Sequence, residues 1–170
     1  MAVEAAAGVA AAVTDADHRW MAQALRLARG AGERGEVPVA AVAVYADSRI
    51  ASASNRMEGG GDATAHAEMT CLRRASRALG GWRLEDVTLY VTLEPCPMCA
   101  SAMVLSRLSR LVYAAGDPKK GADGSAYRLL DHPRNNHRVA VTRGVMAAEA
   151  SALLSDFFNT VRARGGEPIP

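Results

Sequence analysis

Apolar residues recur at helical spacing near the start of the chain and then give way to strand-like runs. In residues 17–34 they form one stripe of a predicted helix, made of Trp20, Met21, Ala24, Leu25, Leu27 and Ala28. Asp15 or Asp17 can cap its start. Residues 37–45 are a nearly continuous β-prone run, and residues 49–54 can return as the second arm of a hairpin.

The rest of the chain alternates helices with strands. Asp62 or Thr64 can cap a helix that ends near Leu79, just before two glycines. The other predicted elements are strands over 87–93, 111–114 and 139–142, helices over 95–106 and 145–164, and a loop over 115–125. This order favours one mostly parallel α/β sheet, opened by the antiparallel hairpin and covered by helices on both faces.

The length of 170 residues fits a single domain that buries about two-thirds of its unfolded surface. We expect this domain over residues 15–165, with residues 1–14 as a disordered extension and 166–170 as a flexible tail. The first charge is Glu4, where a secretory signal peptide would have a basic residue. No later segment approaches the roughly 20 apolar residues of a membrane span. These features predict a soluble, cytoplasmic protein.

Two short motifs carry candidate chemistry, Thr64-Ala-His-Ala-Glu68 and Pro95-Cys-Pro-Met-Cys99. His66, Cys96 and Cys99 are three zinc ligands, which leaves the fourth position of the metal for a water whose pKa falls to about 7. Glu68 can take the proton of that water and pass it to a ring nitrogen and to a departing amine. The pattern therefore predicts a hydrolytic enzyme with one catalytic Zn²⁺ per chain.

The spacing of the four residues constrains their geometry. His66 and Glu68 lie roughly 200° apart around a regular helix, so both reach one site only if the helix meets it end-on. Cys96 and Cys99 share a face at the start of the next predicted helix. A helix N-terminus lowers the pKa of a thiol, and the thiolate is the form that binds zinc. We therefore expect two helix N-termini to converge on one ion.

Two other interpretations of the cysteines stay open at this point. Cys96 and Cys99 form a C-x-x-C between a strand and a helix, which also suits a thioredoxin-like redox site. Alternatively, Cys71 could complete a closed structural zinc site as a fourth ligand. Cys71 lies beside Leu72, however, in a position typical of a small buried apolar residue.

From about His18 to Arg164 the chain resembles the cytidine deaminase superfamily and, within it, the bacterial tRNA-specific adenosine deaminases. The His-x-Glu and Pro-Cys-x-x-Cys pair is shared by the base deaminases. Further matching motifs are Glu36-Val-Pro-Val39, Asn55-Arg56, Gly121-Ala-Asp-Gly-Ser125, Asn136-His-Arg-Val139 and Leu153-Leu-Ser-Asp-Phe-Phe158. The resemblance implies a three-layer α/β/α fold around a mixed five-stranded sheet. It also implies hydrolysis of the wobble adenosine of a tRNA anticodon to inosine.

Carried over by position, the resemblance implies further roles. Asn55 would hydrogen-bond the flipped adenine, and the residues near the anticodon sugars and phosphates would be Asp117, Lys119, His132 and Asn136. Phe157 and Phe158 could stack on bases, and Arg162 is a further candidate RNA contact. The resemblance also implies a homodimer.

Charge is compatible with this partner. Residues 1–100 carry 10 Lys and Arg against 12 Asp and Glu, whereas residues 101–170 carry 10 against 6, or −2 and +4. A mixed solvated surface would explain the same bias. Two alternatives to the tRNA enzyme stay open: a zinc-dependent deaminase of a free base or nucleoside, of the guanine or cytosine type, and a non-catalytic zinc-stabilised RNA-binding module.

Overall fold

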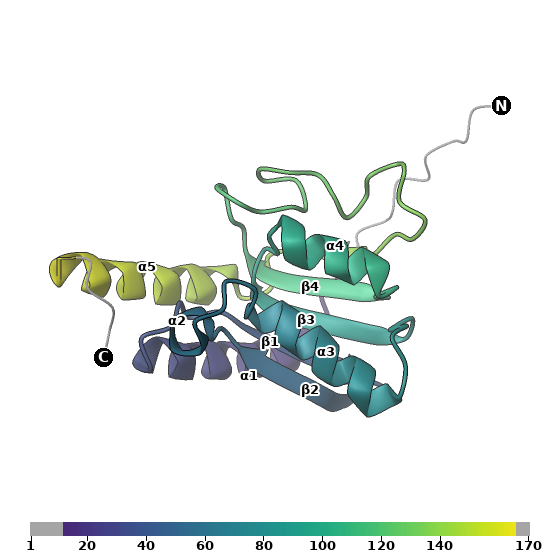
Figure 1. Cartoon of the computed structure of the whole chain (residues 1–170), viewed down its shortest axis with the longest axis horizontal. Helices are drawn as coiled ribbons and strands as arrows, with labels where there is room; N and C mark the ends of the chain where they lie inside the picture. Colours follow the sequence, from purple (N-terminus) through teal and green to yellow (C-terminus); the bar gives the residue numbers. More distant parts are fainter. Residues whose placement is uncertain (1–11, 166–170) are drawn as a thin grey trace.

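A computed structural model of the protein describes residues 12–165 (Figure 1). Most of the expected N-terminal extension and the whole expected tail, 166–170, lie outside the described residues. No helix within 12–165 is both long and apolar enough to cross a membrane.

One mixed sheet of five strands, in the order β2-β1-β3-β4-β5, forms the centre of the molecule. The strands are β1 (Ala40–Tyr45), β2 (Ser48–Ser54), β3 (Val87–Leu93), β4 (Arg110–Ala115) and β5 (Ala140–Thr142). β1 is antiparallel to both of its neighbours, β2 and β3, while β3, β4 and β5 are parallel. β2, β3 and β4 therefore run in the same direction and end at one edge of the sheet.

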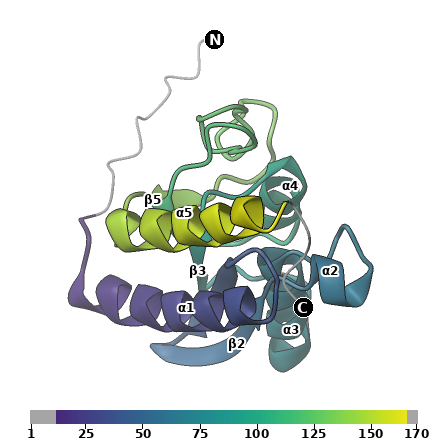
Figure 2. The ribbon, with the colours of Figure 1, turned by 90° about the vertical axis from the view of Figure 1, so that its left-hand side faces the viewer.

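Helices cover both faces, as the sequence predicted. α3 (Ala67–Leu79) and α4 (Pro97–Leu105) pack on one face and lie in front of the strands in Figure 1. α1 (Asp15–Glu33) and α5 (Ala147–Ala163) pack on the other and run alongside each other in Figure 2. A single short turn, α2 (Met57–Gly60), precedes α3. The three-layer α/β/α architecture is confirmed.

Burial on both faces explains the composition of the central strands. β1 reads Ala-Ala-Val-Ala-Val-Tyr, and its first five residues are all buried. Ala41 and Ala43 face α3 and α4, whereas Val42 and Val44 face α1. A strand covered on both sides needs apolar residues at successive positions, which gives a continuous run in place of an alternating one.

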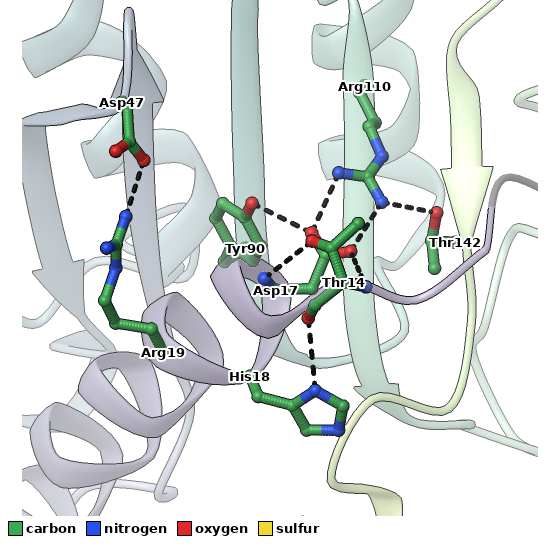
Figure 3. Close-up of polar contacts among 8 residues, drawn as sticks. All are labelled: Thr14, Asp17, His18, Arg19, Asp47, Tyr90, Arg110 and Thr142. Carbon is green, nitrogen blue, oxygen red and sulfur yellow. Dashed lines mark hydrogen bonds and ion pairs between the residues drawn. The ribbon is translucent and has the colours of Figure 1, made fainter.

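A buried ion pair fixes the start of α1 against the sheet (Figure 3). The Asp17 carboxylate accepts hydrogen bonds from the Arg110 guanidinium at 2.8 and 2.9 Å and from the Tyr90 hydroxyl at 3.0 Å. Arg110 also donates to the Thr142 hydroxyl at 2.9 Å. One carboxylate thereby links α1 to β3, β4 and β5. The bidentate geometry makes this a strong charge-assisted contact.

Strand positions were predicted well, but helix starts were not. Thr14, and neither Asp15 nor Asp17, is the N-cap of α1, with Asp17 completing a capping box. Asp62 and Thr64 do not cap α3, because they hydrogen-bond each other in the preceding turn and the helix begins only after His66. α4 likewise begins at 97, two residues later than expected.

We expect Asp17→Asn to lower the free energy of unfolding by about 3 kcal/mol near neutral pH, because it leaves the Arg110 charge without its partner. Burial raises the pKa of Asp17, but hydrogen bonds from Arg110, Thr14 and Tyr90 outweigh it and lower the pKa from 3.8 to about 2. The folded pKa lies below the unfolded one, so this stabilisation is present above pH 3.8 and is lost as the pH falls towards 2. The free energies of unfolding of the unaltered protein and of Asp17→Asn, measured by urea denaturation, should therefore converge as the pH falls towards 2.

Asp47→Asn is the matched control. Asp47 pairs with Arg19 at the surface, where the two side chains are 71% and 53% exposed. Such pairs contribute less than about 1 kcal/mol. Equal destabilisation by the two substitutions would contradict the role given to Asp17.

Candidate active site

His66, Cys96 and Cys99 meet at the edge where β2 and β3 end. His66 is the N-cap of α3, Cys96 is the N-cap of α4, and Cys99 lies in the first turn of α4. The His66 Nδ1 atom lies 3.6 Å from the Cys96 Sγ and 3.5 Å from the Cys99 Sγ. All three donor atoms lie within 4.8 Å of one another. Two helix N-termini therefore converge on one point.

This donor set fits a zinc ion. Zinc lies about 2.1 Å from a histidine nitrogen and about 2.3 Å from a thiolate sulfur, and tetrahedral angles then set a nitrogen–sulfur separation of about 3.5 Å. The two separations in the structure, 3.6 and 3.5 Å, have that size. Three protein ligands also match an open site better than a closed structural one.

The environment favours the metal-binding form of Cys96. Its hydrogen bond with the Cys99 thiol, aided by one with His66, lowers the Cys96 pKa to about 4 against the opposing effect of burial. A lowered pKa favours the thiolate form of Cys96. A zinc ion needs its cysteine ligands in that state.

Glu68 lies beside the three donors in the first turn of α3 and is 4% exposed. It is not one of the clustered donors, yet its carboxylate is close enough to respond to both His66 and Cys99. Burial raises the pKa of this carboxyl above its ordinary value. A buried carboxyl with a raised pKa is suited to hold and release a proton.

Cys71 does not belong to the site. Its side chain is fully buried on α3 among apolar residues such as Ala43 and Leu72, and it is outside the clustered donors. Burial raises the pKa of its thiol to about 12. The closed structural zinc site with Cys71 as fourth ligand is therefore wrong.

Asn55 follows β2 and is held by a residue that the sequence marked only as part of a motif, Glu36. The Asn55 Nδ2 donates to Glu36 Oε2 at 3.1 Å, and both side chains are buried. Glu36 also accepts from the backbone N–H of Gly59 at 2.8 Å and of Glu58 at 3.3 Å. The amide of Asn55 is therefore fixed in orientation. In the sequence, Glu36 was marked only by its place in the motif Glu36-Val-Pro-Val39, directly before a long apolar run.

Asn55 and His66 are close in space because the segment between them folds back. The backbone N–H of Arg56 donates to the Ala65 carbonyl at 3.1 Å, so the two ends of this segment lie together. A residue that could orient a base thus lies next to a candidate metal ligand.

Asp117 and Lys119 lie on the segment that follows β4. The Asp117 carboxylate accepts from the backbone N–H of Lys119 at 2.9 Å and of Lys120 at 3.1 Å, and it therefore shapes its own turn. Both lysine side chains are exposed. The backbone N–H of Ala122 donates to the Pro95 carbonyl at 2.9 Å, which brings this segment next to Cys96.

The other candidate RNA contacts are more dispersed. His132, Asn136, Phe158 and Arg162 are exposed, and no hydrogen bond within residues 12–165 joins them to the clustered donors. Phe157 is half-buried and packs against the end of α1 at Gly32. One ring of the Phe pair therefore packs against α1, and the other faces outward.

Comparison with known proteins agrees with this geometry. The MafB19-like deaminase family model matches residues 15–162. A protein of Bacillus subtilis (strain 168) named tRNA-specific adenosine deaminase is 47% identical over 148 residues, which cover 87% of this chain and 92% of the relative. The chain belongs to the tRNA-specific adenosine deaminase family. Membership in this family makes it an enzyme and excludes the thioredoxin-like interpretation of its C-x-x-C.

Solved structures separate this family from its neighbours. One from a study of A-to-I editing by tRNA:A34 deaminases at the wobble position is 46% identical, with a TM-score of 0.77 over 80% of this chain and 99% of that one. The guanine deaminase from Nitrosomonas europaea is 27% identical, with a TM-score of 0.73 over 86% of each chain. The fold is shared by both, while identity is higher to the tRNA deaminase.

The position of Cys71 predicts how metal binding responds to substitution. We expect the unaltered protein and Cys71→Ser each to bind about one Zn²⁺ per chain and Cys99→Ser to lose most of it, because Cys99 is one of the three donors and Cys71 is not. Metal analysis after dialysis measures both. Loss of zinc from Cys71→Ser with intact folding by circular dichroism would contradict the assignment.

Proposed function

We propose that this tRNA-specific adenosine deaminase family member hydrolyses the wobble adenosine of a tRNA anticodon to inosine and releases ammonia. The observation that carries the proposal is the group formed by His66, Cys96 and Cys99, with buried Glu68 beside it. Removal of an exocyclic amine by water needs an activated water and a group that moves protons. This arrangement can provide both, in the reducing cytoplasm where unpaired thiols persist.

The three donors would hold a zinc ion through His66 Nδ1 and the two sulfurs. Such an ion supplies a Lewis acid that lowers the pKa of a coordinated water to about 7. One neutral imidazole and two thiolates leave the group formally neutral, so the protein adds no charge that would oppose this acidity. The low thiol pKa of Cys96 keeps that donor ready at neutral pH.

Glu68 would move the protons. Its carboxylate can take a proton from the attacking water and deliver it to a ring nitrogen of the adenine. The oxygen of the water forms a bond to C6 of the adenine. A second transfer would move the remaining proton of that hydroxyl to the exocyclic amine, and the C–N bond then breaks to release ammonia. Burial raises the pKa of this carboxyl and so stabilises its protonated form between the uptake of a proton and its delivery.

The remaining candidate residues would recognise the substrate. Asn55, fixed by Glu36, would hydrogen-bond the extruded base, which costs little unstacking energy in an anticodon loop. The residues proposed to contact the surrounding RNA are Asp117, Lys119, His132, Asn136, Phe157, Phe158 and Arg162. Because several of these contacts are charged, binding should weaken as salt concentration rises.

A second copy of the chain is the proposed protein partner. Apolar side chains lie exposed between α3 and α4, where Leu105 is 73% and Trp82 54% exposed. They border a groove of about 500 Å³ that Met69 and Leu72 also line. Exposed apolar surface of this kind is typical of protein interfaces, so this face would form the homodimer.

An anticodon stem-loop with adenosine at the wobble position tests the reaction. We expect conversion to inosine by the zinc-loaded protein and a loss of at least about a thousandfold in Glu68→Ala, because both proton transfers depend on that carboxylate. Glu68→Ala should still contain about one zinc per chain. Nucleoside analysis of the product measures the conversion.

Free guanine and adenosine are the comparison substrates in the same assay. Turnover of a free base without conversion of the stem-loop would contradict the proposal and favour the guanine-type alternative. RNA binding without any conversion would favour a non-catalytic module.

The proposed dimer face has its own test. The unaltered chain should sediment as a dimer. Leu105→Glu should sediment as a monomer, because the substitution places a charge in an apolar contact. Tyr45→Glu, at an exposed position beside the hairpin turn, should leave the dimer intact. A monomeric unaltered protein would contradict the proposed partner.

A further inference from the structure

Glu94 is a buried carboxylate that the proposed chemistry does not use. It lies directly after β3 and is 2% exposed. Its partners all belong to segment 117–125, which follows the next strand, β4. Glu94 Oε2 accepts from the backbone N–H of Asp117 at 3.0 Å, and Oε1 accepts from those of Asp123 at 2.9 Å and Ser125 at 3.3 Å. The Ser125 hydroxyl donates to it as well.

No cation shares this carboxylate among the ion pairs of residues 12–165. Its two oxygens instead accept hydrogen bonds from three backbone N–H groups and one hydroxyl of segment 117–125. The negative charge is therefore balanced by backbone N–H groups of one segment. A side-chain partner could move with its rotamer, whereas backbone donors fix the path of the chain itself.

Segment 117–125 also wraps closely around the carboxylate. A Cβ added at Gly121 would lie 2.6 Å from the Asp117 carbonyl oxygen and 2.3 Å from the Glu94 carboxylate, so only glycine fits there. At Gly116 the same addition would lie 3.6 Å from Glu94, which is ordinary contact. Both glycines lie near the same carboxylate, but only at Gly121 would a larger residue clash with it.

The same carboxylate is close to the candidate metal ligands along the chain. Glu94 precedes Cys96 by two residues, and the backbone between them accepts a hydrogen bond from Ala122 of segment 117–125 at 2.9 Å. The position of this segment determines where Asp117 and Lys119 lie relative to the three donors. Any shift of the segment would move these proposed RNA contacts as one unit.

We propose that Glu94 is a positioning residue, which holds segment 117–125 against the turn before α4 so that its RNA contacts lie at the rim of the metal site. The inference rests on the proposed function, because it assigns this segment to substrate binding. Glu94 itself is not one of the three clustered donors. It affects the reaction only by setting the positions of Asp117 and Lys119.

Steady-state kinetics with the zinc-loaded enzyme and the anticodon stem-loop test this role. Glu94→Gln replaces an acceptor oxygen by an amide that faces N–H donors, and Gly121→Ala forces the segment away from Glu94. Both should raise KM for the stem-loop about tenfold or more while kcat changes less than about threefold, because binding geometry is lost and the proton transfers are kept. Zinc content should stay near about one per chain.

Two control variants separate positioning from general stability. Gly116→Ala adds the same methyl group where there is room and should change KM less than about twofold. Asp17→Asn removes a buried carboxylate on the other face of the sheet. It should therefore lower Tm without raising KM at a temperature well below that Tm. An unchanged KM in Glu94→Gln, or an equal rise in Asp17→Asn, would overturn the inference.

Hydrogen exchange measures the holding directly and needs no substrate. The backbone amides of Asp117, Asp123 and Ser125 should exchange at least about tenfold faster in Glu94→Gln than in the unaltered protein, because the negative charge is lost and only one of the two acceptor oxygens remains. Equal exchange would overturn the inference. An unaltered enzyme that converts no stem-loop would overturn the proposed function instead, and the exchange rates would then still decide whether Glu94 holds the segment.

Discussion

The shared direction of three strands is the constraint on which the site depends. β1 is hydrogen-bonded in antiparallel fashion to both β2 and β3, so these two outer partners must run the same way, and β4 follows β3 in parallel. The segments that leave β2, β3 and β4 therefore start at one edge of the sheet. They bring Asn55 and His66, the pair Cys96 and Cys99, and the segment with Asp117 to the same place. Ligand sites at the carboxyl ends of strands have this origin in many open α/β sheets.

Three buried carboxylates near this sheet differ in how their charge is balanced, and the difference matches their use. Asp17 is paired with Arg110, and Glu94 accepts from backbone N–H groups, and in both cases hydrogen bonds lower the pKa despite burial. Such carboxylates stay ionised and hold the chain in place. Glu68 lacks a comparable set of donors, so burial dominates and raises its pKa. Of the three, only Glu68 has the raised pKa that suits a group that takes up and releases a proton.

Local pattern predicted the strands because burial on both faces leaves an uninterrupted apolar run, as at 87–93, whose bounds the structure reproduces. The convergence of His66 with Cys96 and Cys99 also followed from spacing and helix geometry. The starts of α3 and α4 did not, since Asp62 and Thr64 satisfy each other in a turn. The path of segment 117–125 was beyond local reasoning, because its hydrogen-bond acceptor, Glu94, follows a different strand, β3, and is 23 or more residues away.

The two helices that start at the site differ from α1 in how they begin. Far from the site, α1 begins with a complete capping box between Thr14 and Asp17. At the site, α3 and α4 begin at His66 and Cys96 with no side-chain cap hydrogen bond. A good cap contributes about 1 kcal/mol, so each of these helices gives up stability at its first turn. In return, the positive ends of both helix dipoles face a group of donors whose two cysteines must bind as thiolates. A serine or aspartate at either position would cap the helix better and remove a ligand.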